Sequence, residues 1–478
     1  MSILSGYKPE KMLGYFEEIC KIPHGSGNEE EIAAYIEAFA KERGLFCVRD
    51  SENNVFIRKS ATKGYEDAPA ILLQGHTDMV CEKNSDSNHD FKKDPLDLYI
   101  ENGMLRARGT TLGGDDGAAV AAMLAILDSD DIDHPVLECL FTTAEETGMY
   151  GAVNFDCSLI SAKKLINLDT EKDGEAIAAC AGSADVEYIL DTDRISCSRH
   201  ILKISVSGLA GGHSGADIHL GRQNANRIMG RILARVYEDD PFNIVSVRGG
   251  NMKNAIAREC FAEIVPEDIE RAKAIVYDEA EKLAKEMCAD DKSLRITASR
   301  GKIVDTMLSY KDSSAVINMM TLPHNGVYAM SPEMEDFVRT SSNNGVVTTE
   351  DSCVKLNFMP RSSCDSELSA LLVSFKRIAK AIGCRCEISE RSMGWDLVPD
   401  SALASSFIKC YKELFPGSEP YVTAIHAGLE CGVFVSKTGC DALSIGPDIY
   451  NIHSPDEALD IASCERFWKL LVRMLGDK

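Results

Sequence analysis

Five short segments of the chain carry side chains that can ligate metal ions or transfer protons. In the first, QGHTDMV at residues 74–80, His76 stands two residues before Asp78 and follows an apolar run. Residues i and i+2 of a strand share a face. A neutral imidazole is a zinc ligand, and a nearby carboxylate can fix its tautomer. Taken alone, such a pair is more often a hydrogen-bonded polar pair at a strand end.

Adjacent acidic residues occur in two further segments. GTTLGGDDGAAVAAML places Asp115 and Asp116 among glycines, at the entrance to an apolar helix. Helix capping explains one of these acids, whereas an aspartate with both oxygens free can bridge two metal ions. FTTAEETGMYGA places Glu145 and Glu146 directly after a predicted strand. A Glu pair is commonly a solvated loop, but one member can ligate metal while the other takes a proton from water.

The last two segments complete a set of metal ligands. INLDT puts Asp169 at the end of a predicted strand, and SIGPDIYNIHSPDEA puts His453 after another. All five segments therefore fall where a strand stops, and functional sites of α/β sheets collect at the carboxyl ends of strands. Two histidines, three carboxylates and a spare Asp and Glu suit two zinc ions about 3.5–4 Å apart. The pattern favours metal-assisted hydrolysis.

The elements that must position these residues are typical of an α/β protein. Strand and helix patterns alternate over about the first 180 residues and return from about residue 390. The intervening region has the alternating strands and separate helices of an α+β insertion. We expect a catalytic domain with a mostly parallel sheet, formed by residues 1–198 and 389–478. The inserted α+β domain is predicted at residues 199–388.

Composition narrows the classes of function and partner. A formal net charge of −24 at pH 7 argues against a nucleic-acid partner. The 17 scattered cysteines indicate a reducing cytoplasm rather than a disulfide scaffold. No stretch approaches the roughly 20 apolar residues of a membrane span, and the N-terminus lacks the pattern of a signal peptide. We therefore expect a cytoplasmic protein without a membrane partner.

Several longer blocks of sequence carry a resemblance that runs nearly end to end along the chain. They include LLQGHTDMVCEK, GTTLGGDDGAAVAAMLAIL, FTTAEETGMYGA, SGLAGGHSGADIHLGRQNA, GGNMKNAIARE, IHAGLECGVF and SIGPDIYNIHSPDEAL. In these blocks the chain resembles the aminoacylhistidine dipeptidases (Xaa-His dipeptidase, peptidase D). These are dinuclear zinc exopeptidases related to carnosinase and peptidase T. The resemblance implies a zinc-exopeptidase-like catalytic domain, an inserted lid and dimerisation domain, a dipeptide substrate and a homodimer.

The resemblance also assigns the metal ligands. It implies that His76, Asp115 and Asp169 hold one zinc ion. The second zinc ion would be held by Asp115, Glu146 and His453, with Asp115 bridging the two ions. Carboxylate-rich sites accept several divalent ions, so Mn²⁺ or Co²⁺ are possible substitutes for zinc.

Catalytic roles follow from the same resemblance. Glu145 would be the general base, taking a proton from a zinc-activated water and passing it to the leaving amine. Asp78 would orient His76. The peptide bond between Asp115 and Asp116 is expected to be cis.

Candidate substrate contacts complete what the resemblance implies. His213 in GGHSG would stabilise the oxyanion, and Arg361 in NFMPRSS would grip the substrate's terminal carboxylate. Otherwise these two are a loop histidine and a surface arginine. Asn254 falls in another family block. His426 and Glu430 in HAGLECG would contact the substrate's histidine ring or amino group.

Two other functions remain open at this point. The same metal site would serve a tripeptidase or an amidohydrolase acting on N-acyl amino acids. An alternative of a different class is a catalytically dead binding or scaffold protein that has kept the fold. The complete ligand set and Glu145 favour an enzyme that hydrolyses Xaa-His and related dipeptides.

Overall fold

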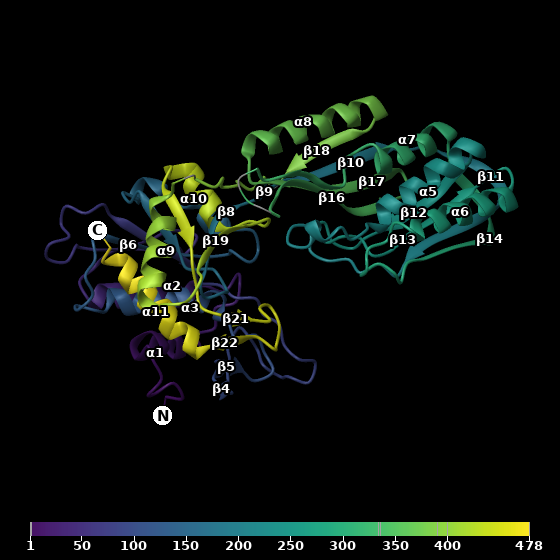
Figure 1. Ribbon diagram of the computed structural model, residues 1–478. Coiled ribbons are helices and arrows are strands. Elements are labelled where there is room, and N and C mark those ends of the chain that lie inside the picture. The colour runs from purple at the N-terminus through teal and green to yellow at the C-terminus, as the bar shows by residue number, and fades with distance from the viewer. Residues whose placement is uncertain (1, 333, 335, 390, 399, 478) are drawn as a thin grey trace. The chain divides into compact units, whose positions relative to one another are not determined.

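The protein consists of two compact units (Figure 1). The computed structural model describes residues 2–332, 334, 336–389, 391–398 and 400–477. The first unit contains the described residues of 2–179, 396–424 and 429–477, and the second contains those of 180–395 and 425–428. An α/β catalytic domain interrupted by an inserted domain is thereby confirmed as the fold class.

The unit boundaries differ from the predicted ones. The sequence placed them after residues 198 and 388, whereas the contacts place them after residues 179 and 395. At the first boundary, β10 (Asp185–Asp191) pairs with β17 (Cys353–Ser362) and β18 (Arg385–Ser389), so it belongs to the second unit's sheet. At the second boundary, Trp395 forms an isolated bridge with Cys180 of the second unit.

The first unit is built on an eight-stranded sheet with the order β1-β2-β6-β3-β7-β20-β8-β19. Its central pairings are parallel, since β3 pairs in parallel with β6 and β7, and β7 with β20. β1 and β2 are joined by a short loop and pair antiparallel, as short connections require. β2 also pairs antiparallel with β6, and β20 with β8, so the sheet is mixed around the expected parallel centre. The strands are β1 (Phe46–Arg49), β2 (Val55–Lys59), β3 (Ile71–His76), β6 (Leu137–Thr142), β7 (Lys164–Asn167), β8 (Glu175–Cys180), β19 (Tyr421–Ile425) and β20 (Asp441–Ser444).

Helices and a small antiparallel sheet complete the first unit. Helix α3 is apolar on all sides and is buried throughout, packing against α1 and β3. The small sheet has the order β21-β22-β5-β4. The remaining elements are α1 (Glu10–Ile19), α2 (Glu30–Glu42), β4 (Leu98–Glu101), β5 (Met104–Ala107), α3 (Gly114–Leu127), α4 (Tyr150–Asn154), η1 (Cys157–Leu159), α9 (Ala402–Leu414), α10 (Glu430–Thr438), β21 (Ile449–Tyr450), β22 (Ala458–Asp460) and α11 (Ile461–Leu475).

The second unit is built on a ten-stranded sheet with the order β14-β11-β13-β12-β16-β17-β10-β18. β15 pairs with β16 and β9 pairs with β17, and all the pairings with a recorded register are antiparallel. Besides β10, β17 and β18, its strands are β9 (Gly182–Ser183), β11 (Arg194–Ser207), β12 (Asn243–Gly249), β13 (Cys260–Val265), β14 (Arg295–Leu308), β15 (Gly326–Met330) and β16 (Val338–Thr349).

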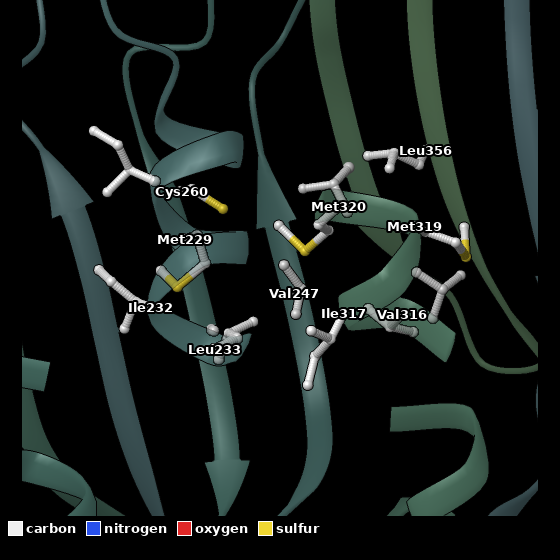
Figure 2. Packing of buried hydrophobic residues seen from close by; sticks show 14 of the residues in the cluster. Met229, Ile232, Leu233, Val247, Cys260, Val316, Ile317, Met319, Met320 and Leu356 are labelled. Atoms are coloured by element: carbon white, nitrogen blue, oxygen red, sulfur yellow. The ribbon is translucent and has the colours of Figure 1, made fainter. Parts of the chain in front are cut away.

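Four helices pack against this second sheet. Helix α5 buries residues at helical spacing, among them Met229 and Leu233. Figure 2 shows these two side chains gathered with Val247 of β12 and Met320 of α7 in one hydrophobic cluster. The helices are α5 (Ala225–Asp239), α6 (Ile269–Ala284), α7 (Tyr310–Thr321) and α8 (Asp365–Ile382), with the short η2 at Ile218–Leu220.

Among the residues that the structure describes, no helix combines the length and the apolarity needed to span a membrane.

Candidate metal centre

Four parallel strands of the first unit end side by side and carry the candidate ligands. β3 ends at His76, which is in register with Thr142 at the end of β6. β7 ends at Asn167, which is in register with Gln74 of β3 and with Ser444 at the end of β20. The segments that follow these strands therefore begin at one edge of the sheet. The apolar composition of β3, which is buried along its whole length, is typical of a central parallel strand.

Asp115 lies between the two candidate histidines. Its Oδ1 is 3.1 Å from Nε2 of His76, and its Oδ2 is 3.2 Å from Nε2 of His453. His76 Nε2 is also 3.5 Å from Oδ1 of Asp169, and His453 Nε2 is 3.0 Å from Oε1 of Glu146. The two oxygens of Asp115 thus face two different groups, each made of one histidine and one further carboxylate.

Asp116, which the sequence left without a role, supports the same group. Its Oδ2 accepts the backbone N–H of His76 at 3.2 Å. A Cβ added to Gly75 would lie only 2.5 Å from that oxygen and 2.5 Å from Cβ of Ala119. A glycine before His76 is therefore needed for this close approach. The peptide bond between Asp115 and Asp116 is cis.

Neighbouring carboxylates shift the pKa values of both histidines. Burial acts to lower the pKa of His76, but the charge of Asp169 and hydrogen bonds with Asp115 and Asp169 raise it well above its ordinary value. Hydrogen bonds with Asp115 and Glu146 raise the pKa of His453 to about 10. Since metal ligation requires neutral imidazoles, divalent ions that bind here replace protons.

The donor chemistry of the site fits divalent cations. Two imidazoles share potential ligand sets with five carboxylates, those of Asp115, Asp116, Glu145, Glu146 and Asp169. Buried carboxylates need compensating positive charge. Imidazole and carboxylate oxygen are ordinary zinc ligands. Three sets of potential ligand atoms each lie within 4.8 Å of one another: His76 with Asp116 and Asp169, His76 with Glu145 and Glu146, and Asp115 with Glu146 and His453.

Asp78 holds the turn that carries both glutamates. Its Oδ1 accepts the backbone N–H of Glu145 at 3.1 Å, and its Oδ2 accepts that of Glu146 at 3.3 Å. Ser26 Oγ also donates to Oδ2, at 2.8 Å. Nδ1 of His76 lies 3.0 Å from the backbone carbonyl of Asp78 but 3.6 Å from its carboxylate. The orienting contact predicted for this residue thus comes from its backbone more closely than from its side chain.

Glu145 lies beside the candidate ligands but belongs to neither of the two groups that face the oxygens of Asp115. Burial raises the pKa of its carboxyl to about 8, and the charges of Glu430, Glu146 and Asp115 act in the same direction. Cationic charge at the centre would favour the ionised form, which is the form that a general base needs.

Glu430 lies inside the first unit. It is fully buried, and its Oε2 accepts hydrogen bonds from Gln74 Nε2 at 2.5 Å and Thr142 Oγ1 at 2.7 Å. These partners stand near the ends of β3 and β6. The expected substrate contact does not fit this placement, because the carboxylate exposes no surface and instead joins the two strands that lead to the centre.

The second unit brings His213 and Asn254 together. The backbone N–H of Ser214 donates to the carbonyl of Asn254 at 2.8 Å, and His213 forms an isolated antiparallel bridge with Ala255. The carboxylate of Asp217 accepts the backbone N–H of His213 at 2.8 Å. Two loops distant in sequence are thereby joined.

Arg361 and His426 lie in the same neighbourhood. Arg361 is buried and its pKa is lowered to about 10 by that burial. Burial and then the Arg361 charge lower the pKa of both His213 and His426, that of His426 to about 3. In the part of the chain that the structure describes, Arg361 has no carboxylate partner within ion-pair distance. It is not a surface arginine, and its environment fits an anionic ligand.

Sequence reasoning missed the side chains that hold these groups in place. Ser26 is 52 residues from Asp78, and Ser341, whose Oγ lies 2.7 Å from Nε2 of His426, is 85 residues away from that histidine. No motif within either segment signals such a partner.

The fold and the paired ligand groups define a metal-dependent hydrolase. A sequence model described as Peptidase family M20/M25/M40 matches residues 72–477. The chain belongs to this family. Together with the relatives described next, this match identifies the chain as a metallo-exopeptidase.

Relatives match over the whole length of the chain. It is 37% identical over 482 residues to the cytosol non-specific dipeptidase of Escherichia coli (strain K12), covering 100% of this chain and 99% of the relative. The crystal structure of an aminoacylhistidine dipeptidase from Vibrio alginolyticus superposes with a TM-score of 0.92 and 37% identity, covering 99% and 98% of the two chains. The aminopeptidase PepT from Bacillus cereus, at 16% identity and a TM-score of 0.58 over 98% of both chains, shares the fold. The predicted family resemblance is confirmed.

Proposed function

We propose that the protein is a metallo-dipeptidase that hydrolyses Xaa-His and related dipeptides with two zinc ions. The observation that carries the proposal is the placement of Asp115, whose two oxygens face His76 and His453 separately. His76, Asp115 and Asp169 would hold one ion, and Asp115, Glu146 and His453 the other. When bound, the ions supply Lewis acidity for the attacking water and the scissile carbonyl.

Glu145 is proposed as the general base. Its backbone is fixed by Asp78, and its carboxylate belongs to a set of atoms with His76 and Glu146. In that position it accepts a proton from the attacking water and returns it to the leaving amine, as a general acid–base group does. Asp78 acts by holding the turn rather than by transferring a proton.

The second unit would supply substrate contacts. Arg361 pairs with the terminal carboxylate of the dipeptide, because its buried guanidinium lacks a carboxylate partner among the described residues. His213 stabilises the oxyanion by donating a hydrogen bond. The carbonyl of Asn254 bonds to the loop that carries His213, and the carbonyl of His426 lies beside Gly215 of that loop. Both residues would complete the substrate contacts.

Location and assembly are part of the proposal. The word cytosol in the name of the Escherichia coli relative supports a cytoplasmic location. A homodimer is proposed on the family resemblance. The word non-specific in that relative's name favours a range of dipeptides wider than Xaa-His.

The test is hydrolysis of a panel by the purified protein with Zn²⁺ or Mn²⁺ added. The panel contains Xaa-His dipeptides, other dipeptides, tripeptides and N-acyl amino acids. We expect dipeptides to be cleaved, and Glu145→Gln to lose at least about 100-fold in kcat while binding metal normally. Preference for tripeptides or N-acyl amino acids would overturn the substrate class. Full activity in Glu145→Gln would overturn the base.

A further inference from the structure

One buried carboxylate outside both ligand groups binds the loop that leads into Asp115. Glu457 is 2% exposed. Its Oε2 accepts the backbone N–H groups of Leu112 at 2.8 Å and Gly113 at 3.2 Å. Its Oε1 accepts those of Gly114 at 2.8 Å and Asp115 at 3.4 Å. Four consecutive peptide N–H groups therefore converge on a single side chain.

The local backbone explains this convergence. Gly113 adopts φ +67, in the left-handed region that glycine tolerates, and a left-handed residue turns successive N–H groups toward one point. A Cβ added to Gly114 would lie 3.2 Å from Oε1 of Glu457. The two glycines before Asp115 thus leave room for the carboxylate and shape the loop around it.

The small sheet brings Glu457 to this loop. β22 pairs with β5, with Leu459 opposite Leu105, so the residues before β22 lie beside the segment that follows β5. Arg106 reinforces the junction by donating to the backbone carbonyl of Asp456 at 2.7 Å. Because His453 stands four residues before Glu457, the segment that carries His453 and the loop that carries Asp115 are joined by this carboxylate.

We infer that Glu457 is a positioning residue of the metal centre that sets the geometry between Asp115 and His453. Both of its oxygens face N–H donors, so it is not a ligand itself. Its effect is larger on the group made of Asp115, Glu146 and His453, because Glu457 fixes the segments of two of these residues, whereas in the other group it fixes only the shared Asp115. Groups that orient metal ligands typically change metal affinity about 10- to 100-fold when they are altered.

The competing explanation is helix capping alone. Helix α3 begins at Gly114, and its N-cap residue makes no side-chain capping bond, so Glu457 also satisfies the first N–H groups of that helix. Capping alone predicts a lower unfolding temperature and unchanged metal affinity, whereas positioning predicts a change in the affinity for one of the two ions.

Glu457→Gln separates these explanations, with Glu138→Gln as the matched control. The amide keeps the shape but offers one acceptor oxygen instead of two. Glu138 is also a fully buried carboxylate that accepts backbone N–H groups, those of Ser161 and Ala162 at 3.0 Å, but it stands near the opposite end of its strand from Thr142.

Zn²⁺ and Co²⁺ are titrated into each metal-free protein by calorimetry, well below the unfolding temperatures of the variants. Hydrogen exchange of amides 112–115 is followed in the same metal-free samples. For Glu457→Gln we expect faster exchange at these amides and about 10- to 100-fold weaker binding of one ion, with a smaller loss for the other, which shares Asp115. Glu138→Gln should keep both affinities.

Wild-type affinities for both ions in folded Glu457→Gln would overturn the inference and leave capping as the role. Should Glu457→Gln fail to fold, Gly114→Ala takes its place, because its Cβ displaces the carboxylate while keeping the charge. Selective weakening of one ion in that variant supports the inference, and unchanged binding of both ions refutes it. The metal titrations do not depend on the substrate, so a failure of the proposed dipeptidase activity is distinguishable.

Discussion

Replacing Asp78 by asparagine should damage the glutamate turn more than the orientation of His76. The carboxylate of Asp78 accepts three hydrogen bonds, from Ser26 Oγ at 2.8 Å and from the backbone N–H groups of Glu145 and Glu146 at 3.1 and 3.3 Å. An asparagine side chain has one acceptor oxygen, and its NH₂ group would face at least one of these donors. The imidazole of His76 would keep its 3.0 Å contact with the backbone carbonyl of residue 78.

The size of the effect follows from these contacts. One buried N–H group left unpaired costs about 1–3 kcal/mol, and bonds to a neutral acceptor are weaker than those to a charged one by about 1 kcal/mol. We therefore expect Asp78→Asn to lose about 2–4 kcal/mol of stability. A displacement of about 1 Å in the turn that carries Glu145 is expected to lower kcat about 100-fold.

The assay compares kcat, KM and metal affinity in Asp78→Asn and in Ser26→Ala. The serine variant removes one donor and leaves both glutamate N–H groups paired, so it should lose only about 1 kcal/mol and keep most of kcat. If Asp78→Asn kept kcat but lost affinity for the ion held by His76, the carboxylate rather than the carbonyl would be orienting that imidazole, and the reasoning would be refuted.

Three further outcomes follow from the structure. Arg361→Lys should raise KM for dipeptides about 10-fold or more, because lysine lacks the planar guanidinium that pairs with a carboxylate through two hydrogen bonds. KM for peptides amidated at the C-terminus should not change. Equal effects on both kinds of peptide would exclude a carboxylate partner. A chelator should abolish activity and lower the unfolding temperature of the first unit, because the carboxylates around Asp115 then face one another without cations. Calorimetry should show that the unfolding temperature of the second unit does not change. The pKa of His426 is lowered from 6.5 to about 3 in the folded protein. Between these pH values the unfolded chain therefore binds more protons than the folded chain. The second unit should lose stability as pH falls from 6.5 toward 3. Denaturant midpoints of His426→Gln, which does not titrate, should fall less steeply over that range.

Local sequence patterns were sufficient to predict that the candidate ligands follow strand ends. The apolar run before His76 marks a buried strand, and parallel strands bring their carboxyl ends to one edge, so convergence of the segments after β3, β6 and β7 could be expected. The antiparallel pairings of the sheet could not be predicted in the same way, because a strand's apolar pattern does not specify which strand it pairs with or in which direction.

Contacts between distant segments account for what the sequence did not reveal. Glu430 follows a loop motif and reads as a substrate contact, yet its carboxylate bonds to Gln74, which is 356 residues away. The second unit begins at residue 180 rather than 199 because β10 finds its partners in β17 and β18. Each of these features depends on pairing that no window of neighbouring residues encodes.

Two carboxylates that ligate no ion in the proposed centre give it shape before metal binds. Asp78 fixes the N–H groups of Glu145 and Glu146, and Glu457 fixes those of the loop that ends at Asp115. In both cases the ligand lies in irregular backbone, after a strand or at the non-helical start of α3, where the backbone N–H groups have no partner in a helix or strand. A buried carboxylate satisfies several such groups at once and thereby restricts the backbone of the ligand residue. Metal affinity should therefore depend on residues that never touch the ions, because the entropy of ordering the two ligand turns is already lost when the chain folds.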